Sequence, residues 1–313
     1  MMKKMIAVLL VLLMAVPFVA CKKDNDTYTV GICQFVQHEA LDAATQGFKD
    51  ALVAKLGDKV EFVEENAAGD TANCTTIVNS LVSSEVDLIM ANATPALQAA
   101  ANATRTIPVL GTSITEYGVA LSIDNFNGTV GTNVSGTSDL APLEDQAAMI
   151  TEWFPETKKV ALFYCSSEAN SKYQVDTVAA LLQAQGIETK MCAFVDSNDM
   201  AQVCEDANAF GDVIYIPTDN AVANATETVN AICDKPIIAG EAGICKGSGG
   251  VATLSIDYYE LGYKTGEMAA QILTGEADVA TMAVGYADAK KFYNAEACEE
   301  LGLTAPNGYE AMS

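Results

Sequence analysis

A chain of 313 residues is longer than one small hydrophobic core usually supports, so two domains of ordinary size are expected. Half of the residues are hydrophobic, which is typical of a globular protein, and the formal net charge is −24 at pH 7. A protein this acidic is repelled by phosphate backbones, which argues against nucleic acid as a partner.

The N-terminus has the order of an export signal. Residues 1–4 are basic, and residues 5–20 form an apolar run that is too short for a stable membrane span. Ala20 then precedes Cys21, and a polar run follows. This order resembles a bacterial lipoprotein signal, in which Cys21 becomes the lipidated first residue of the mature chain and anchors it to the membrane. The alternative is a plain secretory signal that is cut nearby.

The cysteines and the single histidine argue against a metal site. His38 is the only histidine, and no two cysteines have the Cys-x-x-Cys spacing of a zinc or redox motif. Export would permit disulfides, but their pairing cannot be read from spacing. We expect mostly free thiols in apolar surroundings at the eight positions after the signal: Cys33, Cys74, Cys165, Cys192, Cys204, Cys233, Cys245 and Cys298.

In the first half, short β-rich runs alternate with helical patterns. The strands are expected at residues 27–34, 60–64, 86–91 and 107–110, and the helices at 40–55, after Asp70 and from Thr94. Pro95 suits the first turn of a helix. Strands that alternate with helices at this spacing predict a parallel sheet.

The stretch from residue 135 to residue 142 connects this half to the next. It consists of small and polar residues, and it leads into a helical pattern that starts near Leu140. Such a segment suits a crossover at the floor of a cleft. The alternative is an ordinary loop in which Asp139 caps the helix.

The second half repeats the alternation. Strands are expected at 159–165, 188–195, 213–216 and 236–239, with helices at 171–185, after Ser197 and at 219–233. After residues 253–257 a long helix is expected at 258–273, and a late strand at 282–286 and a short helix at 295–300 end the pattern.

The two halves resemble each other. Residues 87–111 and 212–240 each read as strand, Thr near the helix start, helix, Pro, strand and Gly. Repetition at this separation predicts two lobes with one architecture and a ligand between them, at the carboxyl ends of the strands. We expect one lobe at 24–133 plus 255–280, the other at 134–254 plus 281–313, and a hinge of more than one strand.

The cleft positions offer binding chemistry rather than catalysis. No Gly-x-Ser-x-Gly motif, phosphate-binding glycine loop or nucleophile–base pair is present. Uncharged donors, acids and aromatic groups instead recur near the predicted strand ends and helix starts, although each alone is also a common cap. Donors beside acids with few cations suit a zwitterion, and the residues are Phe35, Thr94, Tyr117, Ser138, Asp139, Ser171, Thr218, Asp219, Asn220, Glu241, Asp257 and Tyr258.

Six ordered motifs resemble those of the substrate-binding lipoproteins of ABC transporters of the tryptophan/tyrosine-binding type. They lie at residues 34–42, 93–98, 136–142, 168–171, 217–220 and 256–262. The resemblance implies a periplasmic-binding-protein fold and an amino-acid ligand with an aromatic side chain. It also implies a cleft set of Thr94, Asp139, Asn170, Ser171, Thr218, Asn220 and Asp257. The chain departs from the family pattern at Glu39 and at residues 115–117.

We therefore expect an extracytoplasmic, lipid-anchored binding protein that closes on an amino acid and delivers it to a membrane permease and its ATPase, without a cofactor. Three alternatives remain open at this stage. One is a sugar or nucleoside ligand in the same fold, one is an extracytoplasmic sensor domain, and one is a cleft enzyme.

Overall fold

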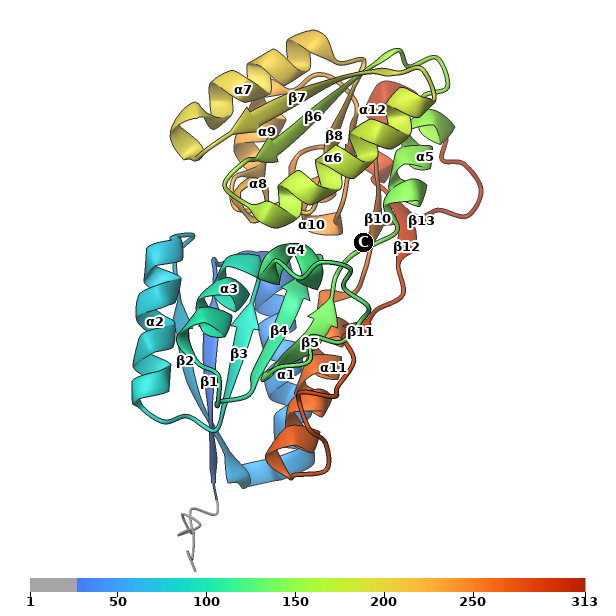
Figure 1. The fold of residues 1–313 in the computed structure, drawn as a ribbon. Coiled ribbons are helices and arrows are strands. Elements are labelled where there is room, and N and C mark those ends of the chain that lie inside the picture. Colours follow the sequence, from blue (N-terminus) through green and yellow to red (C-terminus); the bar gives the residue numbers. More distant parts are fainter. Residues whose placement is uncertain (1–26, 313) are drawn as a thin grey trace, which may run out of the picture.

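Two mainly parallel sheets, one in each lobe, organise the molecule (Figure 1). The computed structural model describes residues 27–312, so Cys21 and the predicted signal at 1–21 lie outside the described residues. The two sheets and the helices that flank them confirm the predicted α/β class with two lobes. No helix among the described residues is long and apolar enough to cross a membrane.

The sheet of the first lobe has six strands in the order β11-β5-β4-β3-β1-β2, all paired in parallel. Its strands are β1 (Tyr28–Gln34), β2 (Val60–Asn66), β3 (Leu88–Asn92), β4 (Val109–Ile114), β5 (Val134–Ser138) and β11 (Gly285–Tyr286). The flanking helices are α1 (Glu39–Leu56), η1 (Gly57–Lys59), α2 (Thr71–Ser83), α3 (Thr94–Ala103), α4 (Tyr117–Leu121) and α11 (Tyr258–Leu273).

The sheet of the second lobe has seven strands in the order β13-β12-β10-β9-β8-β6-β7, and β12 is antiparallel to β10. Its strands are β6 (Lys159–Cys165), β7 (Glu188–Phe194), β8 (Val213–Ile216), β9 (Ile237–Ala239), β10 (Ala252–Ser255), β12 (Lys290–Tyr293) and β13 (Glu310–Ala311). The helices are α5 (Leu143–Trp153), α6 (Ala169–Ala184), α7 (Ser197–Phe210), α8 (Asn220–Ala223), α9 (Thr226–Ile232), α10 (Ala242–Gly247) and α12 (Ala295–Leu301). The predicted helix at 219–233 is thus two short helices.

Two glycines allow α11 to pack closely against α1 in the first lobe. A Cβ atom on Gly262 would clash with the carbonyl oxygen of Ala44 in α1, and one on Gly266 would press on Phe48. Because these positions are glycine, α11 lies directly on α1, and the two helices cover the same face of the first sheet (Figure 1). The apolar side of α1, including Phe48 and Leu52, is fully buried there.

The chain crosses between the lobes after β5, after β10 and after β11, which gives the hinge three strands. The lobe boundaries differ from the expected ones at two points. β5 pairs with β4, and β11 pairs with β5, so residues 134–138 and 285–286 belong to the first sheet. The pattern placed the boundary too early because short polar strands such as β5 lack the apolar signal of a core strand.

The helix after the first crossing begins later than predicted. α5 starts at Leu143 with Pro142 as its N-cap residue, rather than near Leu140. Asp139 therefore does not cap this helix, and it lies on the crossing itself. A carboxylate that is freed from a capping role at the floor of a cleft is available for other contacts.

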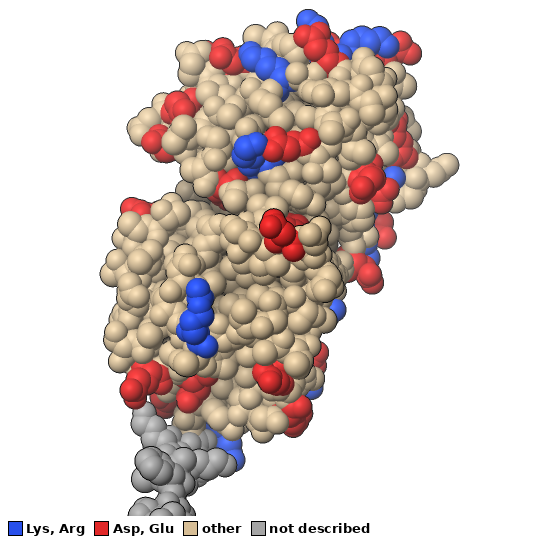
Figure 2. Space-filling view, in the orientation of Figure 1, with Lys and Arg blue, Asp and Glu red and all other residues tan. Residues whose placement is uncertain are grey.

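All eight described cysteines are free thiols, as the sequence suggested, and seven of them are buried. The face in Figure 2 shows acidic and basic side chains scattered over both lobes, with uncharged surface between them. This face presents no continuous basic area of the kind that binds nucleic acid.

Candidate functional site

A small enclosed cavity lies where the two lobes meet. Its volume is about 10 Å³, which is room for about one water molecule. Its walls come from both lobes, and its lining residues follow the carboxyl ends of strands: His38, Ala40, Leu41, Ser113, Thr115, Asp139, Asn170, Thr218, Asp219, Asn220, Ala223, Glu241 and Tyr258. This is the ligand position that two facing open sheets predict.

The first lobe lines the cavity with hydroxyl groups. Ser113 is a residue of β4 with a φ of 55°, a backbone conformation that non-glycine residues rarely adopt. The pairing of β4 with β5 shifts register between Gly111 and Ile114, so Ser113 lies in a bulge. Ala93, just after β3, also has a positive φ, of 82°. Strained backbone conformations cluster at functional sites, so their presence at two neighbouring strand ends indicates a functional site at this edge of the sheet.

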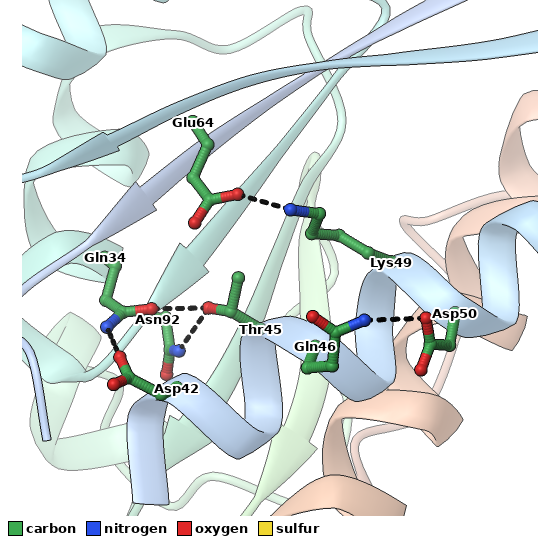
Figure 3. A network of polar contacts seen from close by, with 8 residues as sticks. All are labelled: Gln34, Asp42, Thr45, Gln46, Lys49, Asp50, Glu64 and Asn92. Atoms are coloured by element: carbon green, nitrogen blue, oxygen red, sulfur yellow. Dashed lines mark hydrogen bonds and ion pairs between the residues drawn. The ribbon is translucent and has the colours of Figure 1, made fainter. Parts of the chain in front are cut away.

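A hydrogen-bond network fixes the start of α1 against this edge (Figure 3). Thr45 donates to Oε1 of Gln34 at 2.6 Å, and Gln34 donates to Asp42 at 2.7 Å. Asn92 donates to Oγ1 of Thr45 at 3.0 Å and to the carbonyl of Leu41 at 2.8 Å. The ends of β1 and β3 are thereby tied to the first turns of α1, which carry the lining residues Ala40 and Leu41.

The second lobe contributes buried carboxyl groups. Glu168, 3% exposed, accepts hydrogen bonds from Nδ2 of Asn220 at 2.5 Å and from the backbone N–H of Ala221 at 2.9 Å. Burial and the nearby Asp219 raise the pKa of Glu168 to about 7. Both carboxyl oxygens of Asp219 accept backbone N–H groups, from Cys165 and Val222, and burial raises its pKa.

Glu241 is used in the same way. Its two oxygens accept the N–H groups of Gly243 and Ile244 at the start of α10, at 3.0 and 2.6 Å. Burial raises the pKa of Glu241 to about 7. The acids of the second lobe are therefore satisfied by the protein and hold their own segments in place.

Asp139 differs from these acids. Its Oδ2 accepts a hydrogen bond from the hydroxyl of Tyr258 at 3.0 Å, but its buried Oδ1 has no partner. Burial raises the pKa of Asp139 to about 6, against the lowering effect of the hydrogen bond from Tyr258. The side chain is 5% exposed, so a carboxylate here needs a donor that the protein does not supply.

Two more lining atoms lack partners, namely Oδ1 of Asn170 and Oγ of Ser113. The orientation of the Asn170 amide follows from its neighbours, because its Nδ2 faces Oε2 of Glu168 and the carbonyl of Thr218, both of which are acceptors. Its oxygen is left for the cavity. Three buried acceptors without partners therefore line one small space, and no lysine or arginine is among its described lining residues.

One polar contact spans the lobes at the rim of the cavity. Nε2 of His38, the N-cap residue of α1, lies 3.3 Å from Oδ1 of Asn220 in the second lobe. Burial lowers the pKa of His38, so its imidazole is neutral at pH 7 and adds no positive charge to the site.

The structure brings seven of the predicted site residues together, and those that line the cavity are Asp139, Asn170, Thr218, Asp219, Asn220, Glu241 and Tyr258. The hydroxyls of Ser138 and Ser171 donate to the carbonyls of Thr115 and Thr218, so both are already engaged.

Six predicted residues do not line this cavity, namely Ser138 and Ser171 and the four that follow. Phe35 and Thr94 are buried nearby, after β1 and β3. Tyr117 is 1% exposed, and its hydroxyl donates to the carbonyls of Gly111 and Thr137 inside the first lobe. Asp257 is exposed and accepts the N–H of Glu260 as the N-cap of α11. Asp257 lines a separate space of about 370 Å³ next to the first cavity, together with Tyr259, Lys290 and Phe292.

Three functional candidates escaped the sequence analysis. Ser113 was missed because β4 was expected to end at residue 110, whereas it runs to Ile114, and Thr115 was named only as part of a departure from the family pattern. Glu168 was quoted only as part of a motif, although it directly precedes α6 and binds Asn220 from the next strand end. The position of Glu168 directly before a predicted helix start was the sequence feature that could have identified it as a candidate.

Comparison with known proteins assigns the family. Residues 29–311 match the family model described as ABC transporter substrate binding protein. The chain is 36% identical over 257 residues to a curated relative, the tyrosine-binding protein of Clostridioides difficile, and the match covers 79% of this chain and 73% of the relative.

Two solved structures of similar identity differ in their fit. An ABC domain from Streptococcus pneumoniae in complex with L-Trp is 32% identical with a TM-score of 0.85, covering 91% of this chain and all (100%) of the other. The ligand-free, open structure of a substrate binding protein with adhesive properties from Clostridium difficile is 35% identical, covers 92% and 99%, and has a TM-score of 0.69.

At nearly equal identity and coverage, the chain as a whole superimposes more closely on the L-Trp complex than on the ligand-free, open structure. The cavity of about 10 Å³ agrees with a closed arrangement. With its two-lobed periplasmic-binding-protein fold and the match across residues 29–311, this chain belongs to the family of ABC transporter substrate-binding proteins.

Proposed function

We propose that the chain captures a free α-amino acid with an aromatic side chain between its lobes and delivers it to the permease and ATPase of an ABC importer. The class of ligand is supported by the relatives, one named as a tyrosine-binding protein and one solved with L-Trp. The chemistry of the cavity supports the same class independently, through its unpaired acceptors.

The observation that carries the proposal is the set of three buried acceptors without partners: Oδ1 of Asp139, Oδ1 of Asn170 and Oγ of Ser113. An ammonium group has three N–H donors and one positive charge. It would satisfy all three atoms and compensate the buried carboxylate. A sugar hydroxyl would donate one hydrogen bond and bring no charge, so it fits this set less well.

The carboxylate of the ligand would meet the first turn of α3, beside Thr94. This helix has ten residues, and its start follows the strained Ala93 at the carboxyl end of β3. Helix N-termini offer free N–H groups and a positive dipole end to an anion. The hydroxyls of Ser138 and Ser171 are committed as donors to backbone carbonyls, so they would play a supporting part.

The ligand's side chain would lie against Tyr258 and toward Phe35. A cavity of about 10 Å³ has no room for an amino acid, so the lobes must separate to admit it and close around it less tightly. Three chain crossings permit such a hinge motion without unfolding either sheet. Closing of the lobes on the ligand is a binding event, and we assign no catalytic residue and no cofactor to the cleft.

Substrate-binding proteins of ABC transporters are extracytoplasmic. We extend this to a lipid anchor on Cys21, from the basic, apolar and Ala-Cys order of residues 1–21. Replacing Cys21 by Ser should release the protein from membranes. Unchanged membrane retention of the Cys21→Ser variant would refute the anchor.

Calorimetric titration with the twenty amino acids, a few sugars and a few nucleosides tests the ligand. We expect tryptophan, tyrosine or phenylalanine to bind most tightly, with dissociation constants below the millimolar range. If no amino acid binds below millimolar while a sugar or nucleoside binds tightly, the amino-acid proposal is wrong. Mass spectrometry of ligand retained by the purified protein gives a second, independent reading.

A further inference from the structure

Two thiols on the outer side of the second lobe lie within bonding reach of each other. Sγ of Cys204, on α7, is 2.9 Å from Sγ of Cys233, the residue that ends α9. A disulfide has a sulfur–sulfur distance of about 2.05 Å. The two sulfur atoms therefore need to approach by less than about 1 Å to become bonded.

The surrounding contacts hold this pair in register. The backbone N–H groups of Asp234 and Lys235 donate to Oδ1 of Asn208 on α7, at 3.0 and 3.2 Å. Asn208 lies one helical turn after Cys204, so the segment that follows Cys233 is fastened beside the cysteine it faces. The proximity of the sulfurs is thus supported by three residues other than the cysteines.

Access distinguishes this pair from the other thiols. Cys233 is partly exposed, whereas the remaining seven described cysteines are buried. Cys33 and Cys74 also interact, but both are 0% exposed in the first lobe. A small oxidant can reach the sulfur of Cys233 from solvent, and Cys204 lies directly behind it. The contact between the two sulfurs lowers the pKa of Cys204 and raises the pKa of Cys233, so the inner sulfur is the one that more readily becomes a thiolate.

We propose that Cys204 and Cys233 form a reversible disulfide, with a low-molecular-weight disulfide such as oxidised glutathione as the oxidant. Cys233, the thiol that solvent reaches, gives its proton to a solvent base, and its sulfur then attacks one sulfur of the oxidant, which breaks the oxidant's S–S bond, forms a mixed disulfide and releases one thiolate. The Cys204 thiolate then attacks the sulfur of Cys233 and displaces the second thiolate. The protein loses two protons and two electrons, and the oxidant becomes two thiols.

The bond would constrain a functional segment. The chain between the two cysteines contains β8 and α8, and with them the cleft residues Thr218, Asp219 and Asn220. A covalent loop that encloses this segment limits the unfolded ensemble of the second lobe. Because both cysteines lie on the outer side, away from the lining of the cleft, ligand affinity should stay within about twofold.

The test uses the whole chain with Cys21→Ser, so that only the eight other thiols are counted. The protein is incubated with oxidised glutathione at pH 8, denatured, alkylated and analysed by peptide mass spectrometry. We expect a linked pair of peptides that contain Cys204 and Cys233, the loss of two alkylatable thiols, and a higher midpoint of thermal unfolding that dithiothreitol reverses.

Variants separate the two steps. Cys204→Ser should stop at a stable glutathione adduct on Cys233, Cys233→Ser should gain no adduct, and the neighbouring Cys192→Ser should still form the linked pair. The proposal is overturned if the unsubstituted pair stays alkylatable or stops at the mixed disulfide. None of these outcomes depends on which ligand the cleft binds, so this test and the titration fail independently.

Discussion

The first lobe lines the cleft cavity with hydroxyl groups, whereas the second lobe lines it with buried carboxyls. Ser113 and Thr115 represent the first lobe, and Asp219 and Glu241 the second, with Glu168 directly behind them. Yet the carboxyl oxygens of the acids in the second lobe already accept hydrogen bonds from backbone N–H groups and from Asn220. Asp139, on the crossing between the lobes, keeps one oxygen unpaired.

This contrast shows that the number of acids on one side does not locate the ligand. A carboxylate whose oxygens are all occupied stabilises its own loop, and a ligand that competed for it would have to break those bonds. A buried carboxylate with one unpaired oxygen makes the binding free energy of a ligand more favourable when that ligand donates a hydrogen bond to the oxygen. The comparison therefore predicts that Asp139 governs affinity, whereas the acids of the second lobe govern stability.

The largest effect should follow from removing Asp139. A hydrogen bond to a charged group is worth about 1.5–3 kcal/mol. Asp139→Ala should therefore weaken amino-acid binding by roughly tenfold to a hundredfold. Calorimetry on the folded variant gives the value.

Asp257→Ala is the matched control for Asp139→Ala. Asp257 caps α11 outside the cavity, so its loss should cost about 1 kcal/mol of stability and leave affinity nearly unchanged. Equal losses of affinity in the two variants would contradict the assignment of Asp139 to ligand binding and of Asp257 to helix capping.

The second effect concerns stability and Glu168. Its pKa of about 7 in the folded protein lies above its ordinary value of 4.5, so between these values the native state binds more protons than the unfolded state. The free energy of unfolding should then fall as pH rises from about 5 to about 7.5, by roughly 2 kcal/mol for this group.

Glu168→Gln should flatten that slope, even though it lowers stability overall by giving up one acceptor oxygen. Chemical denaturation of the ligand-free protein across this pH range measures both quantities. A slope that is unchanged in Glu168→Gln would assign the titration to another group.

The third effect is the pH dependence of binding. The pKa of Asp139 is about 6, and an ammonium ligand binds the ionised form, so binding should release a proton near that pH. Affinity should be about tenfold weaker at pH 5 than at pH 7.5. Titrations in two buffers with different heats of ionisation detect the proton, and Asp139→Asn should abolish the dependence. Tighter binding at pH 5 would contradict an ammonium partner.

The smallest effect belongs to the contact across the lobes. His38→Ala removes the hydrogen bond from Nε2 to Asn220, a neutral interaction worth about 0.5–1.5 kcal/mol. Affinity should fall only about twofold to tenfold, through a less favourable closure. A fluorophore pair on the outer helices α2 and α7 would report closure directly, and His38→Gln, which can still reach across, should retain more of it. Unaltered closure in both variants would assign His38 to packing alone.

Much of the architecture could be predicted from the sequence because alternating apolar runs and helical stripes report burial directly. The runs at 86–91 and 213–216 became β3 and β8, and the stripe at 258–273 became α11. β5 was harder, because a strand made of small polar residues between two neighbours has no apolar pattern. Residues 134–138 of β5 and residues 285–286 of β11, which pairs with it, were assigned to the wrong lobe for that reason.

The site was predicted less completely than the fold. Residue type and proximity to a helix start pointed to Asp139 and Asn170, but the same signal pointed to Asp257, which caps α11 and does not line the small cavity. What separates these residues is whether their oxygens already have donors, and that depends on long-range contacts such as Tyr258 to Asp139. Ser113 depends on a bulge whose register no local pattern encodes.

The order of the chain crossings has a consequence for how the protein is made. The first lobe needs α11 and β11, which end at residue 286, and the second needs β12 and β13, which end at residue 311. Neither lobe has its full sheet until almost the whole chain has been synthesised and exported. Each lobe can therefore complete its fold only after the C-terminal segments have been made. A fragment that stops before α11 would leave the apolar faces of α1 and of the first sheet exposed to solvent.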